Sequence, residues 1–407
     1  MRRRAAAYLA GMEYKTVTLR KGRESALNRY SPWLFSGSVA REEEGIADGD
    51  LVGICDAAGQ TVGFGHFQEG SIRVRVLHFG AEAPAADMIA DRLRAALRLR
   101  ATLGLDEDPL TDAYRLVHAA GDGLPGLIVD RYGPVAVVQC HSIGMHRQRQ
   151  EIAEWLVAEV PDVQTVYDKS HAVLPERYAT TFTDGPLLGT LPDELIVREN
   201  GRRFRIDVAE GQKTGFFLDQ RENRWLVGSY AKDKAVLNTF CYTGGFSVYA
   251  LLGGAARVDS VDLSERATTL TEANVRLNTE ATDRHRAHTA DVLEWLRDHA
   301  PEPTYDIIVV DPPAYAKNKH RRHKAVQAYK RLNARAIRAL KPGGLLVSFS
   351  CSRVVDRQLF YDTIVAAGLE SGRTARVLHR LGQGPDHPVG LYHAEGEYLK
   401  GLVVQVD

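Results

Sequence analysis

The 407-residue chain lacks several sequence features that mark nucleic-acid-binding, membrane or secreted proteins. Its 52 basic and 52 acidic side chains balance, so a nucleic-acid-binding surface can only be local. It has no apolar run long enough to span a bilayer, and the few apolar residues after Met1 are too short for a signal peptide. We therefore expect a cytoplasmic globular protein with two or three domains and no membrane partner.

Cysteine is also scarce. The chain has four, at Cys55, Cys140, Cys241 and Cys351, and no two of them form a Cys-x-x-Cys pair. This spacing predicts no metal site and no disulfide framework, as is typical of proteins in a reducing compartment.

A third absence is the dinucleotide fingerprint G-x-G-x-x-G, although residues 236–247 have the order of strand, glycine turn and helix that surrounds it. Its earlier glycine positions hold Asn238, Phe240 and Cys241. This disfavours the close approach of a pyrophosphate. The turn at Gly244 and Gly245 leads into a helix whose N–H groups suit a smaller anion, such as the carboxylate of S-adenosylmethionine (SAM). A plain turn without a ligand is the alternative.

Three carboxylates stand at the ends of successive predicted strands. Asp262 lies about 20 residues beyond the glycines, where an acid typically receives ribose hydroxyls. Asp291 ends the next strand, and Asp311 ends the one after it and begins an Asp-Pro-Pro stop that cannot continue a ladder. Helix capping is the alternative for Asp262 and Asp291, and Ser264 could cap in place of Asp262.

The segment 317–331, just beyond the Asp-Pro-Pro stop, is basic and contains no acid. Such a run beside a reaction loop suits a phosphate backbone, and a solvated helix face is the alternative. Tyr315 and Tyr329 are available to stack bases. The candidate RNA contacts in the run are Lys317, Lys319, Arg321, Arg322 and Lys324.

Periodicity and turn residues predict the regular elements outside this region. The apolar spacing over 85–103 and 145–160 predicts two helices, and an Asn-Gly pair at 200–201 predicts a hairpin. Short alternating segments predict a small β-barrel. They are Thr16–Leu19, Leu51–Cys55, Val62–Phe67 and Ile72–Leu77.

Several motifs in combination resemble a known family. Besides the glycine turn and the Asp-Pro-Pro stop, they are Phe216-Phe-Leu-Asp-Gln-Arg-Glu-Asn-Arg224, Ser350-Cys-Ser352, Ser31-Pro-Trp-Leu-Phe-Ser-Gly37, Asp122-Gly-Leu-Pro-Gly-Leu-Ile-Val-Asp-Arg-Tyr132, Asp386-His-Pro388 and Glu397-Tyr-Leu-Lys-Gly401. Together they cover nearly the whole chain. They are similar to the bacterial class I SAM-dependent family that forms 5-methylcytosine in large-subunit (23S) ribosomal RNA.

The resemblance implies an α/β fold with three domains. A frayed end over 1–12 would precede a PUA-like β-barrel over 13–82 and a central α+β domain over 83–192. A Rossmann-like SAM-dependent methyltransferase domain would follow over 193–407. The resemblance also implies SAM as cofactor, 23S ribosomal RNA or a large-subunit assembly intermediate as partner, and a homodimer.

The same resemblance, with the strand-end acids, gives a set of cofactor contacts. They are Phe217, Asp219, Gln220, Asn238, Phe240, Thr243, Gly244, Gly245, Asp262, Asp291 and Asp311.

The chemistry of the reaction calls for a thiolate, because cytosine C5 becomes a good nucleophile once sulfur has added to C6. Lys341-Pro-Gly-Gly344 is expected to be a turn before a buried strand that ends at Cys351. By this position and the family's Ser-Cys-Ser motif, Cys351 is the predicted nucleophile, and an inert buried cysteine is the alternative. Asp311 would stabilise charge on the ring, and Pro312 and Pro313 would fix the loop around the flipped base.

Two other functions remain open at this point. A SAM-dependent enzyme that methylates an amino group of an rRNA base also uses an Asp-Pro-Pro loop, but it would leave Cys351 without a role. A non-catalytic RNA-binding ribosome-assembly factor would need none of the three strand-end acids in this register.

Overall fold

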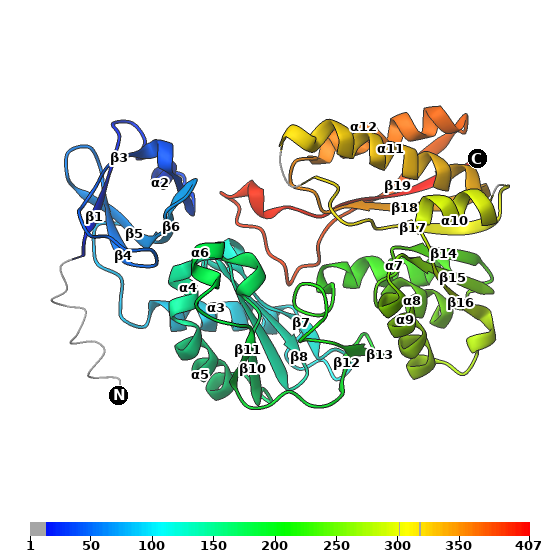
Figure 1. The fold of residues 1–407 in the computed structure, drawn as a ribbon, viewed down its shortest axis with the longest axis horizontal. Helices are drawn as coiled ribbons and strands as arrows, with labels where there is room; N and C mark the ends of the chain where they lie inside the picture. The colour runs from blue at the N-terminus through cyan, green and yellow to red at the C-terminus, as the bar shows by residue number, and fades with distance from the viewer. Residues whose placement is uncertain (1–13, 301, 317–318) are drawn as a thin grey trace. The chain divides into compact units, whose positions relative to one another are not determined.

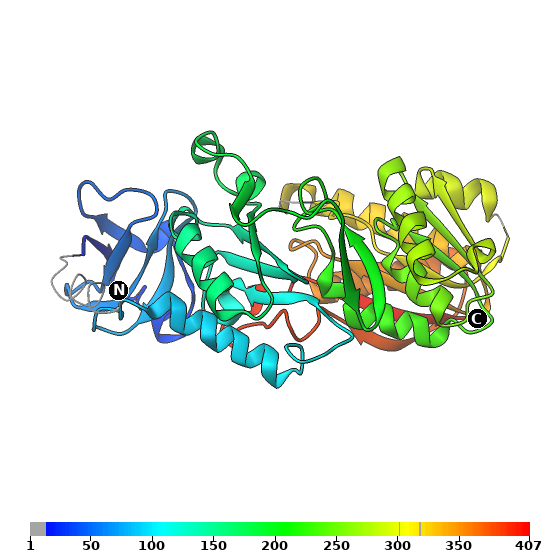
Figure 2. The same cartoon turned by 90° about the horizontal axis from the view of Figure 1, so that it is seen from below.

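The computed structural model describes residues 14–300, 302–316 and 319–407, so the expected frayed end over 1–12 lies outside them. The chain divides into two compact units (Figure 1; a second view is Figure 2). The first contains the described residues up to Leu195 together with Ile206–Phe216 and Pro385–Gly396. The second contains Ile196–Arg205, Phe217–Gly384 and Glu397–Asp407. No helix in the described ranges is long and apolar enough to cross a membrane.

The first unit begins with a six-stranded sheet in the order β2-β6-β5-β4-β1-β3. Its strands are β1 (Thr16–Leu19), β2 (Trp33–Phe35), β3 (Val39–Glu42), β4 (Leu51–Cys55), β5 (Thr61–Phe67) and β6 (Ile72–Phe79), with the short helix α2 (Ser25–Asn28). Val17, Val52 and Val74 are fully buried in its core. The alternation of the sequence marked β1, β4, β5 and β6, whereas β2 has only three residues and β3 has one buried residue followed by three exposed ones, which gives no period of two.

A five-stranded sheet follows in the order β11-β10-β9-β8-β7. It consists of β7 (Ala113–His118), β8 (Leu127–Tyr132), β9 (Val135–Cys140), β10 (Thr165–Asp168) and β11 (Gly185–Leu188); α6 (Glu176–Ala179) lies between the last two. Leu93 of α3 (Met88–Thr102) and Ile152 of α5 (Arg149–Glu159) pack with Val129 and Val138 in one core.

The single helix predicted over 145–160 is wrong, because the structure has two. The first, α4 (Ile143–Arg147), begins earlier, where Ser142 Oγ accepts a hydrogen bond from Met145 N at 3.4 Å. Gln148 then leaves helical geometry, with φ −96° and ψ 3°, before α5 begins. Apolar periodicity alone did not reveal this break.

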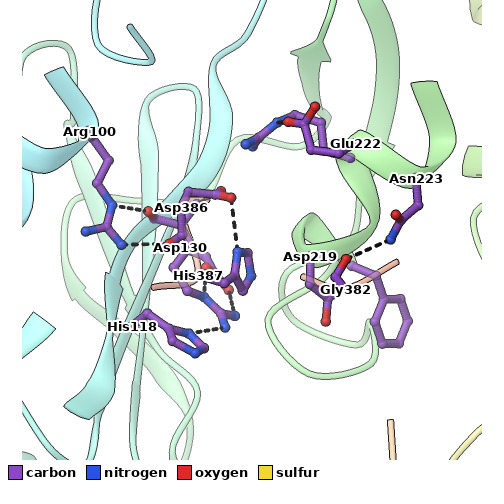
Figure 3. A network of polar contacts seen from close by, with 12 residues as sticks. Arg100, His118, Asp130, Asp219, Glu222, Asn223, Gly382, Asp386 and His387 are labelled. Carbon is purple, nitrogen blue, oxygen red and sulfur yellow. Dashed lines mark hydrogen bonds and ion pairs between the residues drawn. The ribbon is translucent and has the colours of Figure 1, made fainter. Parts of the chain in front are cut away.

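The segment Pro385–Gly396 belongs to the first unit through a buried polar network (Figure 3). Arg100 donates to both carboxylate oxygens of Asp122, at 2.6 and 2.9 Å, and to the carbonyl of Asp386 at 2.7 Å. Asp386 Oδ2 accepts from Arg115 N at 3.0 Å. A Cβ on Gly121 would lie 1.9 Å from the carbonyl oxygen of Pro388. The glycine-rich turn over 121–126 is therefore a packing feature.

The second unit is built on a seven-stranded sheet in the order β16-β15-β14-β17-β18-β20-β19. The strands are β14 (Ala235–Thr239), β15 (Arg257–Asp262), β16 (His285–Thr289), β17 (Tyr305–Val310), β18 (Leu340–Ser350), β19 (Ala375–Leu381) and β20 (Lys400–Val406). The first five are parallel, and β20 is antiparallel to both of its neighbours. The expected turn at residues 341–344 is a bulge inside β18, where the partners of Tyr305 and Ile307 jump from Leu340 to Leu345.

Helices cover both faces of this sheet, which makes it doubly wound. In Figure 1, α11 (Arg322–Ala339) and α12 (Arg357–Ser371) lie above it, and α7 (Arg221–Tyr230), α8 (Gly245–Leu252) and α9 (Glu265–Asn278) lie below it. Side chains of α11, α12 and α10 (Val292–His299) share a core with Leu237 and Ile308 of the sheet. The predicted hairpin is β12 (Leu195–Glu199) and β13 (Arg202–Ile206).

Candidate active site

The candidate site lies where the strand order reverses. Strand β14 pairs with β15 on one side and β17 on the other, so the crevice beyond their carboxyl ends is a topological switch point. The loop over 238–247 follows β14, Asp311 follows β17, and Cys351 follows β18. The parallel register of the sheet thus brings these three predicted features to one edge.

The loop after β14 has a strained backbone. Phe240, Tyr242 and Gly244 have φ values of 56°, 46° and 76°, and such left-handed geometry costs about 1–3 kcal/mol for a residue other than glycine. Asp262 Oδ2 holds the loop by accepting from Tyr242 N at 3.0 Å. A Cβ on Gly244 would lie 2.6 Å from Thr271 Cγ2, so only glycine fits there.

Arg224 supports the same loop from beneath. A Cβ on Gly245 would lie 2.7 Å from Arg224 Cδ. The buried guanidinium donates to both oxygens of Glu199, at 2.8 and 2.5 Å, and to the carbonyl of Phe217 at 2.9 Å. The ring of Phe217 meets that of Tyr242 edge-on, with centroids 5.2 Å apart. The segment that begins at Phe217 is therefore tied to the loop.

Asn238 and Thr243 are buried, and each is hydrogen-bonded to one of the helices that follow the loop. Asn238 Nδ2 donates to Ser247 Oγ at 2.8 Å, and the carbonyl of Thr243 accepts from Asn274 Nδ2 at 2.9 Å. These bonds fix the course of the backbone from β14 into α8.

The structure decides between the capping alternatives of the two acids. Ser264 is the N-cap of α9, since its Oγ accepts from Ala267 N, and Asp262 Oδ1 accepts from Ser264 N at 3.0 Å. Asp291 is the N-cap of α10, with Oδ1 accepting from Leu293 N and Glu294 N. Asp291 therefore caps a helix, and its contact with adenine stays a prediction.

Asp311 belongs to a chain of side-chain amides. Gln220 Nε2 donates to Asp311 Oδ2 at 2.9 Å, and Asn223 Nδ2 donates to Gln220 Oε1 at 2.6 Å. Asn223 also donates to the carbonyl of Gly382 at 3.0 Å, as Figure 3 shows. Asp219 Oδ2 accepts from Tyr398 OH at 2.6 Å. The amide chain orients Asp311 and joins it to the segment predicted to contact the cofactor.

The end of β18 is attached to the Asp-Pro-Pro loop. Ser352 Oγ donates to the carbonyl of Ala316 at 3.0 Å, which ties the residue after Cys351 to the end of that loop. In the loop itself, Pro312 is buried and Pro313 is exposed. Cys351 therefore stands beside the loop that Asp311 opens.

Exposure separates Cys351 from the other cysteines. Cys55, Cys140 and Cys241 are buried, whereas Cys351 is half-buried. Burial raises the pKa of Cys241 to about 12, and its Sγ lies 3.4 Å from Thr271 Oγ1. Cys241 is thus a packing residue of the loop, and Cys351 is the least buried of the four cysteines.

The basic run is described in part. Lys317 and the side chain of Lys319 lie outside what the structure describes. Arg321, Arg322 and Lys324 are exposed at the start of α11, whose first turn contains no acid. Cations at a helix N-terminus oppose the helix dipole by about 0.3–1 kcal/mol each, so this arrangement disfavours the helix and suits an anionic partner.

Two aromatic predictions have different outcomes. Tyr329 is fully buried in the core between α11 and the sheet, so the prediction that it stacks on bases is wrong. Its place in the apolar stripe of α11 explains the burial. Tyr315 is half-buried, with its ring centroid 4.8 Å from that of Tyr329, and its contact with RNA stays a prediction.

Sequence reasoning missed Lys400 and Tyr398. Lys400 begins β20 and Tyr398 lies two residues before it, and Lys400 Nζ donates to the carbonyl of Ser352 at 2.8 Å. The available signal was a lysine placed directly before the apolar run of residues 401–404.

Two known families match segments of this chain. Residues 142–395 match the S-adenosylmethionine-dependent methyltransferase family, and residues 17–79 match the PUA-like domain. Ribosomal RNA large subunit methyltransferase I of Shewanella amazonensis is 40% identical over 394 residues, which cover 96% of this chain and 99% of that protein. Its namesake from Klebsiella pneumoniae is 38% identical over 397 residues, covering 97% and 98%.

A solved structure has the same fold. A protein from Streptococcus mutans, described as a SAM-dependent methyltransferase, superposes with a TM-score of 0.79 at 24% identity, covering 96% of this chain and 99% of the other.

Proposed function

The chain belongs to the SAM-dependent methyltransferases and to the family of ribosomal RNA large subunit methyltransferase I, and from this premise we propose that it forms 5-methylcytosine in 23S ribosomal RNA. The relatives are named for large-subunit ribosomal RNA, and the PUA-like domain is consistent with that substrate. The choice of cytosine C5 rests on the site.

The observation that carries the proposal is the position of Cys351. It follows β18, whose parallel neighbour β17 runs into Asp311, and Ser352 is bonded to the Asp-Pro-Pro loop. Addition to a pyrimidine C6 requires a thiolate that the base can reach, and Cys351 is half-buried whereas the other three cysteines are buried. Transfer to an exocyclic amino group has no use for a thiol at this point.

The residues of the second unit suit SAM. Thr271 and Arg224 fill the space that a Cβ would need at Gly244 and Gly245, so the loop of residues 238–247 can enter α8 only with glycine at these positions. Its N–H groups, at the start of α8, would hold the carboxylate. Asp262 would accept from the ribose, Asp291 from adenine, and Phe217, Asp219 and Gln220 would line the other side. When bound, SAM supplies an electrophilic methyl group.

The side chains then have defined tasks. The Cys351 thiolate would form a bond from Sγ to C6 of a ring protonated at N3, which moves an electron pair toward C5 and leaves the ring without net charge. Asp311, oriented by Gln220, would stabilise the protonated ring near N3 and N4. After C5 has accepted the methyl group and lost its proton, the Sγ–C6 bond would break and return the thiolate.

RNA would be held by the PUA-like domain and by the exposed cations at the start of α11. Arg321, Arg322 and Lys324 are placed to meet phosphates, which supply most of the affinity of nucleic-acid complexes. Pro313 precedes these cations in the sequence and is exposed. The flipped base would pass it.

Mass spectrometry of ribosomal RNA nucleosides tests this function. We expect 23S RNA from cells that lack the gene to lose one 5-methylcytosine. The wild-type gene and Cys140→Ala should restore it, and Cys351→Ser should not. Loss of an N-methylated base in place of 5-methylcytosine would support amino-group transfer, and no change in any base would support an assembly factor.

A further inference from the structure

Lys400 is a buried cation at the start of β20. Its exposed fraction is 4%, and Leu402, Val403 and Val404 follow it in the sheet core. A lysine is almost never fully buried unless it is paired, because its ammonium loses its water on burial. The surroundings of Lys400 must therefore compensate the charge.

Two backbone carbonyls on either side receive the ammonium. Lys400 Nζ donates to the carbonyl of Ser352 at 2.8 Å and to that of Tyr398 at 2.7 Å. In the antiparallel ladder, Lys400 is paired with Ser350. The lysine is thus paired with the residue before Cys351 and hydrogen-bonded to the residue after it. This geometry holds the ammonium beside the thiol.

The charge of Lys400 depends on its neighbours. Burial lowers the pKa of Lys400 to about 8, and the Cys351 thiolate acts in the opposite direction. A group with this pKa is still mostly protonated at neutral pH. The pKa of Lys400 is thus set by two opposing effects, its burial and its proximity to Cys351.

Other titratable groups around this pair are weaker influences on Lys400. Arg357 lowers its pKa, Glu397 and Asp356 raise it, and Arg357 and Glu397 are paired with each other. On the α11 side, burial raises the pKa of Tyr329 well above its usual value, so this neighbour of Cys351 is neutral.

We propose that Lys400 is a positioning residue that holds Cys351 as a thiolate for attack on C6. An adjacent ammonium favours the charged form of a thiol. The proposal rests on the proposed role of Cys351 as nucleophile, and it assigns Lys400 no contact with the base.

The proton balance is simple. The thiol proton passes to solvent, which leaves a thiolate beside the ammonium of Lys400. When the Sγ–C6 bond forms, the ammonium keeps its proton and its two carbonyl bonds. When that bond breaks, the electron pair returns to sulfur next to the same cation.

The test is the pH dependence of Cys351 alkylation by iodoacetamide, measured on the Cys351 peptide by mass spectrometry, without RNA. In the wild type we expect the rate to reach half its maximum below about pH 8.5, the ordinary thiol value. In Lys400→Gln, whose neutral amide can still donate to the carbonyls, the midpoint should rise by about one unit or more.

Lys341→Gln is the matched control, because Lys341 lies at the opposite end of β18 and pairs with Asp306 at 3.0 Å. It should leave the midpoint unchanged. SAM binding by calorimetry should be the same in all three proteins, which checks their folding. A midpoint in Lys400→Gln equal to that of the wild type would mean that the lysine is only structural.

If Lys400→Gln does not fold, the alkylation midpoint of the wild type alone still tests the proposal. A wild-type midpoint at or above about 8.5 overturns the proposal. The outcome is separate from that of the proposed function, because a shifted midpoint without 5-methylcytosine formation would refute only the reaction.

Discussion

The carboxylate of Asp262 holds the loop after β14 and is also the proposed acceptor for the ribose of SAM. Its two oxygens accept from Tyr242 N and Ser264 N, and each carboxylate oxygen can accept a further bond. Asp262→Ala should weaken SAM binding by about 1–3 kcal/mol, since a buried hydroxyl and the loop amide both lose their acceptor.

Calorimetric titration of SAM measures this effect. Asp283→Ala, an exposed acid before β16, should bind SAM like the wild type. An Asp262→Ala protein that folds and keeps wild-type affinity would remove the ribose assignment.

The chemistry of single residues was predictable to the extent that it depends on neighbours in sequence. Asp311 and Cys351 were found because each directly follows an apolar strand. The long-range contacts of the site residues were not predicted. Gln220 is 91 positions from Asp311, and Tyr398 is 179 positions from Asp219. Periodicity tells which face a side chain occupies, whereas such contacts depend on the order of strands in the sheet.

Among the elements, α7 contributes a buried ion pair. Arg224 and Glu199 have side chains that are 3% and 0% exposed. Arg224→Met should lower the free energy of unfolding by about 3–5 kcal/mol, because it leaves the Glu199 carboxylate buried without its cation.

Urea unfolding measures this loss. The matched control is Arg276→Met, because Arg276 pairs with Glu272 on the exposed side of α9 and the change should cost less than about 0.5 kcal/mol. Equal, small effects of both variants would show that the buried pair does not support the loop.

A second prediction at the scale of elements concerns the exposed arginines at the start of α11. Reversal of both Arg321 and Arg322 to Glu should raise KM for RNA more than it lowers kcat, because the arginines meet phosphates and not the reacting base. The slope of log affinity against log salt should fall by about 0.7 for each lost contact to a single strand.

Filter binding over a range of salt concentrations gives this slope. Arg335→Glu, an exposed change farther along α11, should leave it unchanged. A slope that does not move in the double variant would make the run a solvated helix face.

Element boundaries were predictable where caps or turn residues mark them. Helix α9 was located from Ser264 before it, and the β12–β13 hairpin from its Asn-Gly pair. The break between α4 and α5 was missed because Gln148 is a good helix former, and its geometry is set by packing. A turn was predicted at the β18 bulge because Pro-Gly-Gly sequences occur in turns as well as in bulges.

At the scale of the whole molecule, each unit is completed by segments that are distant in sequence. Asp386, in the segment Pro385–Gly396, accepts from Arg115 N and receives Arg100 at its carbonyl. Asp386→Ala should destabilise the first unit by about 1–3 kcal/mol, because a buried N–H loses its acceptor.

Limited proteolysis with mass spectrometry should then show faster cleavage between residues 385 and 396. Glu395→Ala is the control in the same segment, since the Glu395 side chain is 64% exposed. Unchanged cleavage in Asp386→Ala would show that other contacts hold the segment. Local periodicity could not predict this arrangement, because nothing in residues 385–396 marks them as part of the first unit.

The most direct measurement for the whole account is covalent trapping on RNA with 5-fluorocytosine at the target. Fluorine at C5 cannot leave as a proton does, so the Sγ–C6 bond should persist. With SAM present, we predict that the wild type gives an RNA adduct that resists denaturation, with the mass on the Cys351 peptide, and that Cys351→Ser gives none. A wild type that methylates normal RNA but forms no adduct, or an adduct on another cysteine, would contradict the account.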